Sequence, residues 1–513
     1  MPHLHRRNFL KAAGIATLAL SARSYGRVLG ANERIGVAFL GTGGRCQAHI
    51  EIINTLKNQG KGVEPVAVCD VWDGYEGTYE TVRDGKVIKR NYSQGLYPSA
   101  KKCGLRPEDS KHVTKDYRRV LELPEVDVVC IATPDHWHAK MTIDAAAAGK
   151  HIYCEKPMTR TIDEAHAVVD AVKKYNRVMT VGVQSMADPT WRIAYEYIRN
   201  GKIGHVAQGQ TSYYRNSIEG QWRYYPILRE MNPKTIDWDM FLGYKFSVFD
   251  GEPIGPNLPF DRALFAQWRC YWPFGGGMFT DLFVHQTTHL IAAMGVRYPA
   301  RVVGAGGIYL EYDGRDVPDV ATVVADYEEG CQLIVTATMI NRYPIEETIR
   351  GRLGTIKFVK GGFEIIPDEP AGGAGTPARL EDRIRGEFVD CKPPEGRNAD
   401  TLALWEDFLR CVREGRRDTL SPPELGAAAF TTVNMGVLSY RTGKVYRWDK
   451  VQRKPVPDDG TWSAMWEKRS HERGKPNNII GWQAGDTGCV VKTPDYNLRL
   501  AGPWINGRDP ADR

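Results

Sequence analysis

The chain has 513 residues, of which 42% are hydrophobic and 25% are charged, as in ordinary globular proteins. Its length exceeds one usual hydrophobic core, so two domains are expected. The formal net charge is +6, but residues 1–31 hold five basic and no acidic side chains, and subtracting these five leaves +1 for the rest. A body that is nearly neutral excludes nucleic-acid binding through a broad basic surface.

The N-terminus predicts export. Residues 5–22, HRRNFLKAAGIATLALSA, join Arg6 and Arg7 to a short, weakly apolar run, which resembles a twin-arginine signal. We therefore expect a signal peptide over residues 1–31, recognition by the twin-arginine export machinery, and a periplasmic or otherwise exported protein. No other stretch of about 18 apolar residues occurs, so no permanent membrane span is expected after processing.

The pattern that follows is typical of a dinucleotide site. Residues 34–40 (RIGVAFL) predict a strand, residues 41–46 (GTGGRC) a tight turn, and residues 47–58 a helix whose N-terminus suits a pyrophosphate. A second strand over residues 63–70 ends at Asp70, which is placed to accept hydrogen bonds from ribose hydroxyls and to repel a 2′-phosphate. NAD is therefore favoured over NADP.

Two further strands end in polar clusters. Residues 127–132 and 151–154 are short and apolar, an alanine-rich helix lies between them, and they are followed by residues 133–138 (TPDHWH) and 155–157 (EKP). Ligands of such folds bind beyond the carboxyl ends of the strands. The predicted cofactor-binding residues are Gly41, Thr42, Gly43, Gly44, Arg45, Asp70, Thr133, Pro134, His138, Glu155, Lys156 and Gln184.

The second half of the chain predicts a large sheet. Residues 209–275 are rich in aromatic side chains, which suit stacking on sugar rings but are more often core. Strand patterns follow between residues 301 and 359, and helical patterns over residues 400–414 and 423–442. The expected fold is α/β, with an N-terminal Rossmann doubly wound parallel sheet over residues 33–158 and a C-terminal α/β domain with a mostly antiparallel open sheet over residues 159–450. Residues 451–513 form an extension.

Candidate catalytic side chains lie in residues 274–289, FGGGMFTDLFVHQTTH. If this stretch is helical after the glycines, Asp281, His285 and His289 share one face. An unperturbed histidine is largely neutral at pH 7, whereas the pKa of a lysine must fall by about 3 units, roughly 4 kcal/mol, before it can act as a base. We therefore predict His285 as the base and Lys156 as a protonated donor to the reacting oxygen.

A metal site is the alternative for these histidines. His285 and His289 stand at i and i+4, and with His136 and His138 nearby in the fold their spacing permits zinc. No cysteine or H-E-x-x-H motif accompanies them, so a site without a metal is favoured.

The motifs GTGGR, TPDHWH, YCEKP, VGVQ and GGGMFTDLFVH together resemble the glucose-fructose oxidoreductase / inositol dehydrogenase (Gfo/Idh/MocA) family over residues 33 to about 450. The resemblance implies an NAD(P)-binding Rossmann domain, a catalytic group at Lys156, Asp281 and His285, a cis bond before Pro157, and a homo-oligomer. We assign substrate contacts to Trp137, Arg269 and His289. Cys46 and the long C-terminal extension depart from the family pattern.

These expectations favour an exported NAD-dependent oxidoreductase that acts on a hydroxyl of a sugar or cyclitol. Export in the folded state implies a tightly held cofactor that must be reset within the same site. The alternative is a redox-neutral NAD-dependent glycosidase or lyase, in which oxidation, elimination and re-reduction follow one another. A third hypothesis is a non-catalytic carbohydrate-binding protein, against which the intact Lys156, Asp281 and His285 count.

Overall fold

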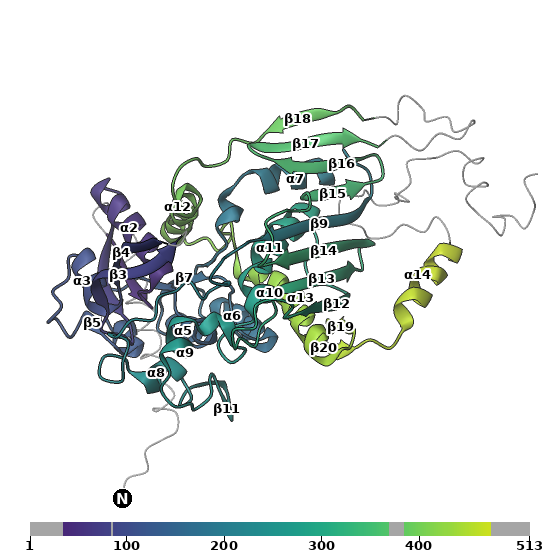
Figure 1. Cartoon of the computed structure of the whole chain (residues 1–513). Helices are drawn as coiled ribbons and strands as arrows, with labels where there is room; N and C mark the ends of the chain where they lie inside the picture. Colours follow the sequence, from purple (N-terminus) through teal and green to yellow (C-terminus); the bar gives the residue numbers. More distant parts are fainter. Residues whose placement is uncertain (1–33, 84–85, 369–383, 473–513) are drawn as a thin grey trace, which may run out of the picture.

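A computed structural model describes residues 34–83, 86–368 and 384–472 (Figure 1). The elements form a parallel sheet of six strands and a mixed sheet of ten, with a two-stranded hairpin beside the first sheet. The predicted α/β class, a parallel Rossmann sheet followed by a large and mostly antiparallel sheet, is confirmed. The predicted leader, residues 1–31, lies outside the described residues.

The N-terminal sheet has the strand order of a dinucleotide-binding domain. Every neighbouring pair is parallel, and the order reverses between β1 and β6, which creates the crevice where such folds bind ligands. In sheet order the strands are β5 (Val113–Thr114), β2 (Val63–Cys69), β1 (Ile35–Leu40), β6 (Val128–Ile131), β7 (His151–Glu155) and β8 (Met179–Gly182).

The Rossmann sheet continues past the predicted boundary at residue 158. Helix α6 (Ile162–Lys174) begins with a capping box between Thr161 and Glu164, and β8 then pairs with β7. The other helices around the sheet are α2 (Gly44–Asn58), α3 (Leu96–Lys102), α4 (Tyr117–Leu121) and α5 (Asp135–Ala147). The first domain therefore includes the strand that ends at Gly182.

The C-terminal sheet is antiparallel except where β14 pairs with β9. In sheet order it comprises β18 (Glu387–Asp390), β17 (Gly362–Pro367), β16 (Gly354–Val359), β15 (Thr348–Gly351), β9 (Val206–Tyr214), β14 (Cys331–Thr338), β13 (Val320–Tyr327), β12 (Arg301–Gly307), β19 (Tyr446–Asp449) and β20 (Lys454–Pro457). Helices α7 (Thr190–Arg199), α11 (Phe283–Met294) and α13 (Pro423–Thr442) cover one face (Figure 1). Strand β20 extends this sheet beyond residue 450, where the sequence places the end of the domain.

Short elements connect the two sheets and end the described chain. They are α8 (Trp238–Leu242), α9 (Arg262–Ala266), α10 (Gly277–Asp281), α14 (Thr461–Glu472), β10 (Ser247–Phe249), β11 (Glu252–Pro253) and the 3₁₀ turns at Gln184–Ala187 and Trp268–Cys270. No helix in the described ranges is long and apolar enough to cross a membrane.

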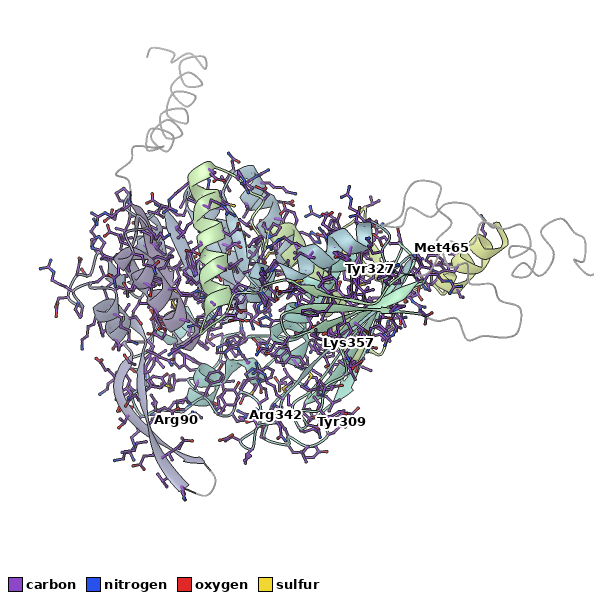
Figure 2. The ribbon with its side chains drawn as sticks, turned by 90° about the horizontal axis from the view of Figure 1, so that it is seen from above. Arg90, Tyr309, Tyr327, Arg342, Lys357 and Met465 are labelled. Carbon is purple, nitrogen blue, oxygen red and sulfur yellow. The ribbon has the colours of Figure 1, made fainter. Side chains whose placement is uncertain are left out.

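A β-hairpin that the sequence analysis did not predict follows β2. Strands β3 (Tyr75–Arg83) and β4 (Lys86–Gln94) pair antiparallel and extend from the N-terminal domain, as the position of Arg90 shows (Figure 2). Tyrosines of the hairpin pack on a cluster that contains Trp72 and Met231. Because Met231 belongs to the aromatic segment of the C-terminal domain, the hairpin joins the two domains.

Helix α12 (Ala399–Glu414) returns to the N-terminal domain from the far end of the chain. The Trp405 ring is 0% exposed, it stacks on Tyr153 with ring centroids 4.3 Å apart, and its indole N–H donates to His49 Nδ1 at 2.9 Å. The helix thus completes the core of the Rossmann domain.

We expect Trp405→Ala to lower the free energy of unfolding by about 3–5 kcal/mol, because it removes a fully buried aromatic ring and leaves a cavity. Urea denaturation followed by circular dichroism measures the change. Tyr343→Ala is the control, since this ring is 85% exposed and its loss should cost less than about 0.5 kcal/mol. Equal effects of the two substitutions would contradict the role assigned to α12.

Candidate active site

A cavity of about 1360 Å³ lies at the carboxyl edge of the Rossmann sheet. One end is formed by the glycine turn and Asp70, the middle by Thr133 and Pro134, and the other end by aromatic and basic side chains that include Tyr225 and Arg269. The polar clusters that follow β1, β2 and β6 therefore meet in one place, as the strand pattern predicted.

The glycine turn leaves room for a diphosphate. Gly41 has φ +78°, and a Cβ there would lie 2.8 Å from the backbone of Thr133, so only glycine fits. A Cβ on Gly43 would meet no atom within 4 Å. No side chain caps α2 at Gly43, so the N–H groups at the start of this helix are open to an anion.

Asp70 retains an acceptor for a ribose hydroxyl. Its carboxylate accepts from the backbone N–H of Thr42 at 2.6 Å, from the Thr42 hydroxyl at 3.0 Å and from the N–H of Trp72 at 2.9 Å. A carboxylate offers about four acceptor positions, so one stays available. The Thr133 hydroxyl is buried without a hydrogen-bond partner in the described chain. These groups fit a dinucleotide, with Thr42 supporting Asp70 rather than lining the cavity.

Glu155 holds a buried charge network instead of facing the cavity. Its Oε1 accepts from Arg45 Nε at 2.7 Å and contacts His49 Nε2 at 2.9 Å. Because Trp405 donates to His49 Nδ1, the proton of the neutral imidazole is on Nε2 and is donated to Glu155. Burial acts to raise the pKa of Glu155, but Arg45 and the His49 hydrogen bond hold it well below its usual range.

Lys156 and Asp281 join the two domains through an ion pair. The ammonium donates to both the backbone oxygen and Oδ1 of Asp281, each at 2.8 Å, and the two side chains are only 14% and 10% exposed. Arg269 Nε donates to the same Oδ1 at 3.3 Å, and Trp222 Nε1 donates to Oδ2 at 3.2 Å. Burial opposes ionisation, but the charges of Lys156 and Arg269 keep the pKa of Asp281 well below its usual range.

His285 lies just beyond a break in the helix. The sequence predicted one continuous helix, but α10 ends at Asp281 and α11 begins at Phe283. Burial and the nearby charge of Lys156 lower the pKa of His285 to about 3, so the ring is neutral at pH 7. Its ring centroid is 6.1 Å from that of Tyr213. Nothing in the described chain hydrogen-bonds to the ring, which leaves it able to contact a substrate.

The predicted catalytic residues Lys156, Asp281 and His285 are not among the residues that line the main cavity. Besides Thr42 and Glu155, three further predicted contact residues do not line it either. His289 lies one turn beyond His285 on α11, where it stacks on Trp191 at 3.8 Å and its Nε2 contacts Glu347 at 2.7 Å. His138 lies between the carbonyl oxygens of Pro157 and Thr133, at 2.6 and 2.9 Å, and so joins the two cofactor-facing loops.

The third of these residues, Gln184, opens onto a second cavity of about 480 Å³ that Thr401 also lines. Trp137 and Arg269 do line the main cavity. The Lys156–Pro157 peptide bond is cis, as the resemblance implied.

The histidines do not gather around a common point. His136 Nε2 and Trp137 Nε1 both contact the carbonyl oxygen of Phe241, at 2.8 and 3.0 Å. Throughout the described residues, no three His, Cys, Asp or Glu side chains meet as a metal site would require.

Two parts of the site escaped the sequence analysis. Trp222, which donates to Asp281, has φ +67°, a rare conformation for a bulky residue, and only its place in an aromatic-rich segment marked it. The β3–β4 hairpin supplies Tyr79 and Tyr92 to the cavity wall. The Asp84-Gly85 pair between two alternating segments was a signal that could have identified the hairpin.

Comparison with protein families agrees with both domains. Residues 35–183 match an oxidoreductase family with an NAD-binding Rossmann fold, and residues 254–357 match the GFO/IDH/MocA C-terminal domain. The chain belongs to the Gfo/Idh/MocA family. The cofactor of its Rossmann domain is NAD, in agreement with the cavity geometry.

Relatives of this Gfo/Idh/MocA protein act on sugars according to their names. A glycosyl hydrolase family 109 protein of Shewanella baltica is 30% identical over 265 residues, 46% of this chain and 50% of that protein. Levoglucosan dehydrogenase of Pseudarthrobacter phenanthrenivorans is 44% identical over 100 residues, 20% of this chain and 26% of that protein. The chain thus matches about half the length of the first relative and about a quarter of the second.

A solved structure of levoglucosan dehydrogenase with NADH and levoglucosan shares the fold. Its TM-score is 0.55 at 20% identity, and the match covers 83% of this chain and all of that chain. The similarity supports the two-domain architecture.

We expect Gly43→Ala to fold normally, because its φ of −70° suits alanine and the new methyl group meets no protein atom. The methyl group would instead occupy the space of the cofactor diphosphate. NAD affinity should fall more than tenfold, about 1.4 kcal/mol or more, while the melting temperature of the apoprotein stays unchanged. Fluorescence titration with NAD and a thermal melt check both parts. Unchanged affinity would contradict diphosphate binding at this turn.

Proposed function

We propose that this protein oxidises a hydroxyl group of a sugar or cyclitol and transfers the hydride to a tightly held NAD. The observation that carries the proposal is the ion pair between the Lys156 ammonium and Asp281, with the neutral His285 on the next helix. Arg269, which also donates to Asp281, links this group to the cavity that begins at a dinucleotide-binding turn. NAD supplies the hydride acceptor when bound. The protein supplies positions for the substrate and for its proton.

Lys156 is the donor to the reacting oxygen in this proposal. An ammonium has three N–H groups, and Asp281 accepts two of them in the described structure. The third can donate to the substrate oxygen and stabilise negative charge that develops as the C–H bond breaks. Asp281 provides a carboxylate partner for the ammonium, so we assign Lys156 the role of donor and not that of base.

His285 receives the hydroxyl proton. Its pKa of about 3 in the free protein keeps it unprotonated at neutral pH. The same value makes it a weak base until negative charge from the substrate offsets the effect of Lys156. The substrate oxygen is therefore expected to lie between the Lys156 ammonium and the His285 imidazole, and its proton passes to His285 as it approaches.

Tight retention of NAD has support from the hairpin. Trp72 follows Asp70 closely, its ring centroid lies 6.1 Å from Tyr92 of β4 and 6.0 Å from Phe265 of the C-terminal domain, and its indole donates to Glu230 O at 3.1 Å. The wall beside the ribose-binding carboxylate is thus shared by both domains, which supports slow release of the cofactor.

The redox-neutral glycosidase or lyase is the second candidate function. The 265-residue similarity to a glycosyl hydrolase favours it. Oxidation of a hydroxyl acidifies the neighbouring C–H bond, and loss of that proton to a base expels the glycosidic substituent and leaves a double bond. Water adds to this double bond in a glycosidase, or the double bond remains in a lyase, and the hydride then returns to the carbonyl carbon. The third hypothesis, a non-catalytic sugar-binding protein, is disfavoured by the assembled Lys156, Asp281 and His285.

An assay with aryl glycosides separates the first two functions. The purified protein is incubated with the glycosides without added NAD, and phenol release and bound NADH are measured together. Phenol release with bound NADH constant at steady state supports the glycosidase. Accumulation of bound NADH on addition of free sugars, without phenol release, supports the oxidoreductase. Neither signal with any sugar would support the binding protein.

We also propose export by the twin-arginine machinery and assembly as a homo-oligomer. The Arg6-Arg7 leader supports the first, and the sheet face that faces away from α7, α11 and α13 supports the second (Figure 1). Fusion of residues 1–31 to a reporter, with and without Arg6→Lys and Arg7→Lys, tests export. Light scattering of the purified protein tests assembly.

Lys156→Met and His285→Asn should each reduce turnover by about 10²-fold or more, because each removes one partner of the proton and charge transfer. Equilibrium binding of NAD should persist, since neither side chain lines the dinucleotide half of the cavity. Steady-state kinetics measures turnover with whichever sugar reacts in the preceding assay. Lys101→Met is the control, because the Lys101 side chain is 62% exposed. Undiminished turnover in either variant removes that residue from the mechanism.

Trp72→Ala should accelerate NAD dissociation by about tenfold or more, because it removes the ring that joins the hairpin to the C-terminal domain. The rate at which a dialysed sample loses cofactor measures this change. Trp462→Ala on α14, outside the main cavity, should leave the rate unchanged. Equal rates in the wild type and Trp72→Ala would show that the hairpin does not retain the cofactor.

A further inference from the structure

The reacting end of the cavity carries excess positive charge. Lys156 and Arg269 both contact Asp281, and a third cation, Arg215, is close enough to sense the charge of the same carboxylate. The carboxyl of Asp135 is also near Arg269 and Lys156, but burial raises its pKa well above its usual range, so the cations outnumber the ionised carboxylates at this end. The oxidised nicotinamide ring is itself cationic, so binding of the cofactor does not relieve this excess.

Arg215 is held close to the proposed base. It follows strand β9, its guanidinium lies 4.8 Å from the centre of the Tyr213 ring, and its Nη2 donates to the Tyr213 hydroxyl at 2.6 Å. The Tyr213 ring is the one that lies 6.1 Å from His285. Arg215 lines the cavity, and the Tyr213 ring is next to both Arg215 and His285. We therefore expect a group bound to Arg215 to lie near His285.

Arg215 differs from the other half-buried arginines near the cavity. Arg45 pairs with Glu155, and Arg223 pairs with Asp313 at 3.0 Å. The described chain offers Arg215 no carboxylate within ion-pair distance; its partners are the Tyr213 hydroxyl and, at 3.1 Å, the amide oxygen of Gln221. Withdrawing a guanidinium from water without a counter-ion is costly, which indicates that an anion completes the site.

A second arginine marks the route into the same end. Arg342 follows β14, lines the cavity, and is exposed on the same side of the molecule as Arg90 of the hairpin (Figure 2). Among the described residues that line the cavity, the carboxylates are Asp70, at the ribose end, and the exposed Glu219. A cavity of this charge distribution attracts anions.

We propose that the sugar substrate carries an anionic group, a carboxylate, sulfate or phosphate, which Arg215 binds beside the reacting carbon and Arg342 attracts at the entrance. The inference rests on the proposed function, because it concerns the substrate of the same cavity. The planar guanidinium can donate two parallel hydrogen bonds to such a group. The bound anion would also offset the charge of Lys156 and so strengthen His285 as a base.

Calorimetric titration of the NAD-loaded protein tests the proposal without requiring turnover. The probes are D-glucose with D-glucuronate, D-galactose with D-galacturonate, and the 6-sulfate and 6-phosphate of both sugars. We expect an acidic member to bind at least tenfold more tightly than its neutral partner, and the tightest acid identifies the anionic group. Arg215→Met should abolish the preference, Arg215→Lys should retain part of it, and Arg229→Met, an exposed arginine outside the cavity, should retain all of it.

Two results overturn the inference: neutral sugars that bind as tightly as every acidic partner, or an acidic preference that survives Arg215→Met. Bound NADH, recorded in the same samples, separates this failure from that of the proposed function. Reduction of NAD by neutral and acidic sugars alike leaves the oxidoreductase intact and removes the anionic substrate. Acid binding through Arg215 without any formation of NADH supports the anion site and removes the proposed oxidation of these sugars.

Discussion

The ion pair between Lys156 and Asp281 is the contact on which the candidate site depends. Lys156 follows the fifth strand of the parallel sheet, whereas Asp281 ends a short helix of the other domain. Their bond joins the carboxyl edge of the Rossmann sheet to α10 of the C-terminal domain. A pair with both partners largely shielded from water is costly to separate, which fixes the two domains relative to each other at the point where chemistry is proposed.

The electrostatics of the site follow from this pair. Asp281 accepts hydrogen bonds from Lys156, Arg269 and Trp222, so both oxygens of its carboxylate have partners within the protein. His285, one turn further, experiences the nearby ammonium and burial and is held neutral. Asp281 therefore holds the ammonium in place, whereas burial and that ammonium keep the imidazole uncharged against the opposing effect of the carboxylate. The surplus of cations around Asp281 accounts for the anionic substrate that we propose.

Contacts between distant parts of the chain support this arrangement on its other sides. Helix α12 inserts Trp405 against His49 and Tyr153, which orders the Glu155 network directly before Lys156. The hairpin after β2 packs on the aromatic segment through Trp72. The first contact completes the core of the Rossmann domain, and the second joins the two domains beside the cofactor cavity.

Local pattern in the sequence determined the strands, the glycine turn, Asp70, Lys156 and the fold class, because short apolar runs and their polar ends reflect interactions between near neighbours. The same local reasoning missed the hairpin and placed the first domain boundary before α6 and β8. Only the tertiary structure decided which side chains meet. His289 shares a sequence motif and a helix with His285, yet Glu347 and Trp191 from other elements occupy its ring. Trp222 and Arg215 reach the site from another segment altogether, since hydrogen bonds and charge act across space and leave no periodic trace in the chain.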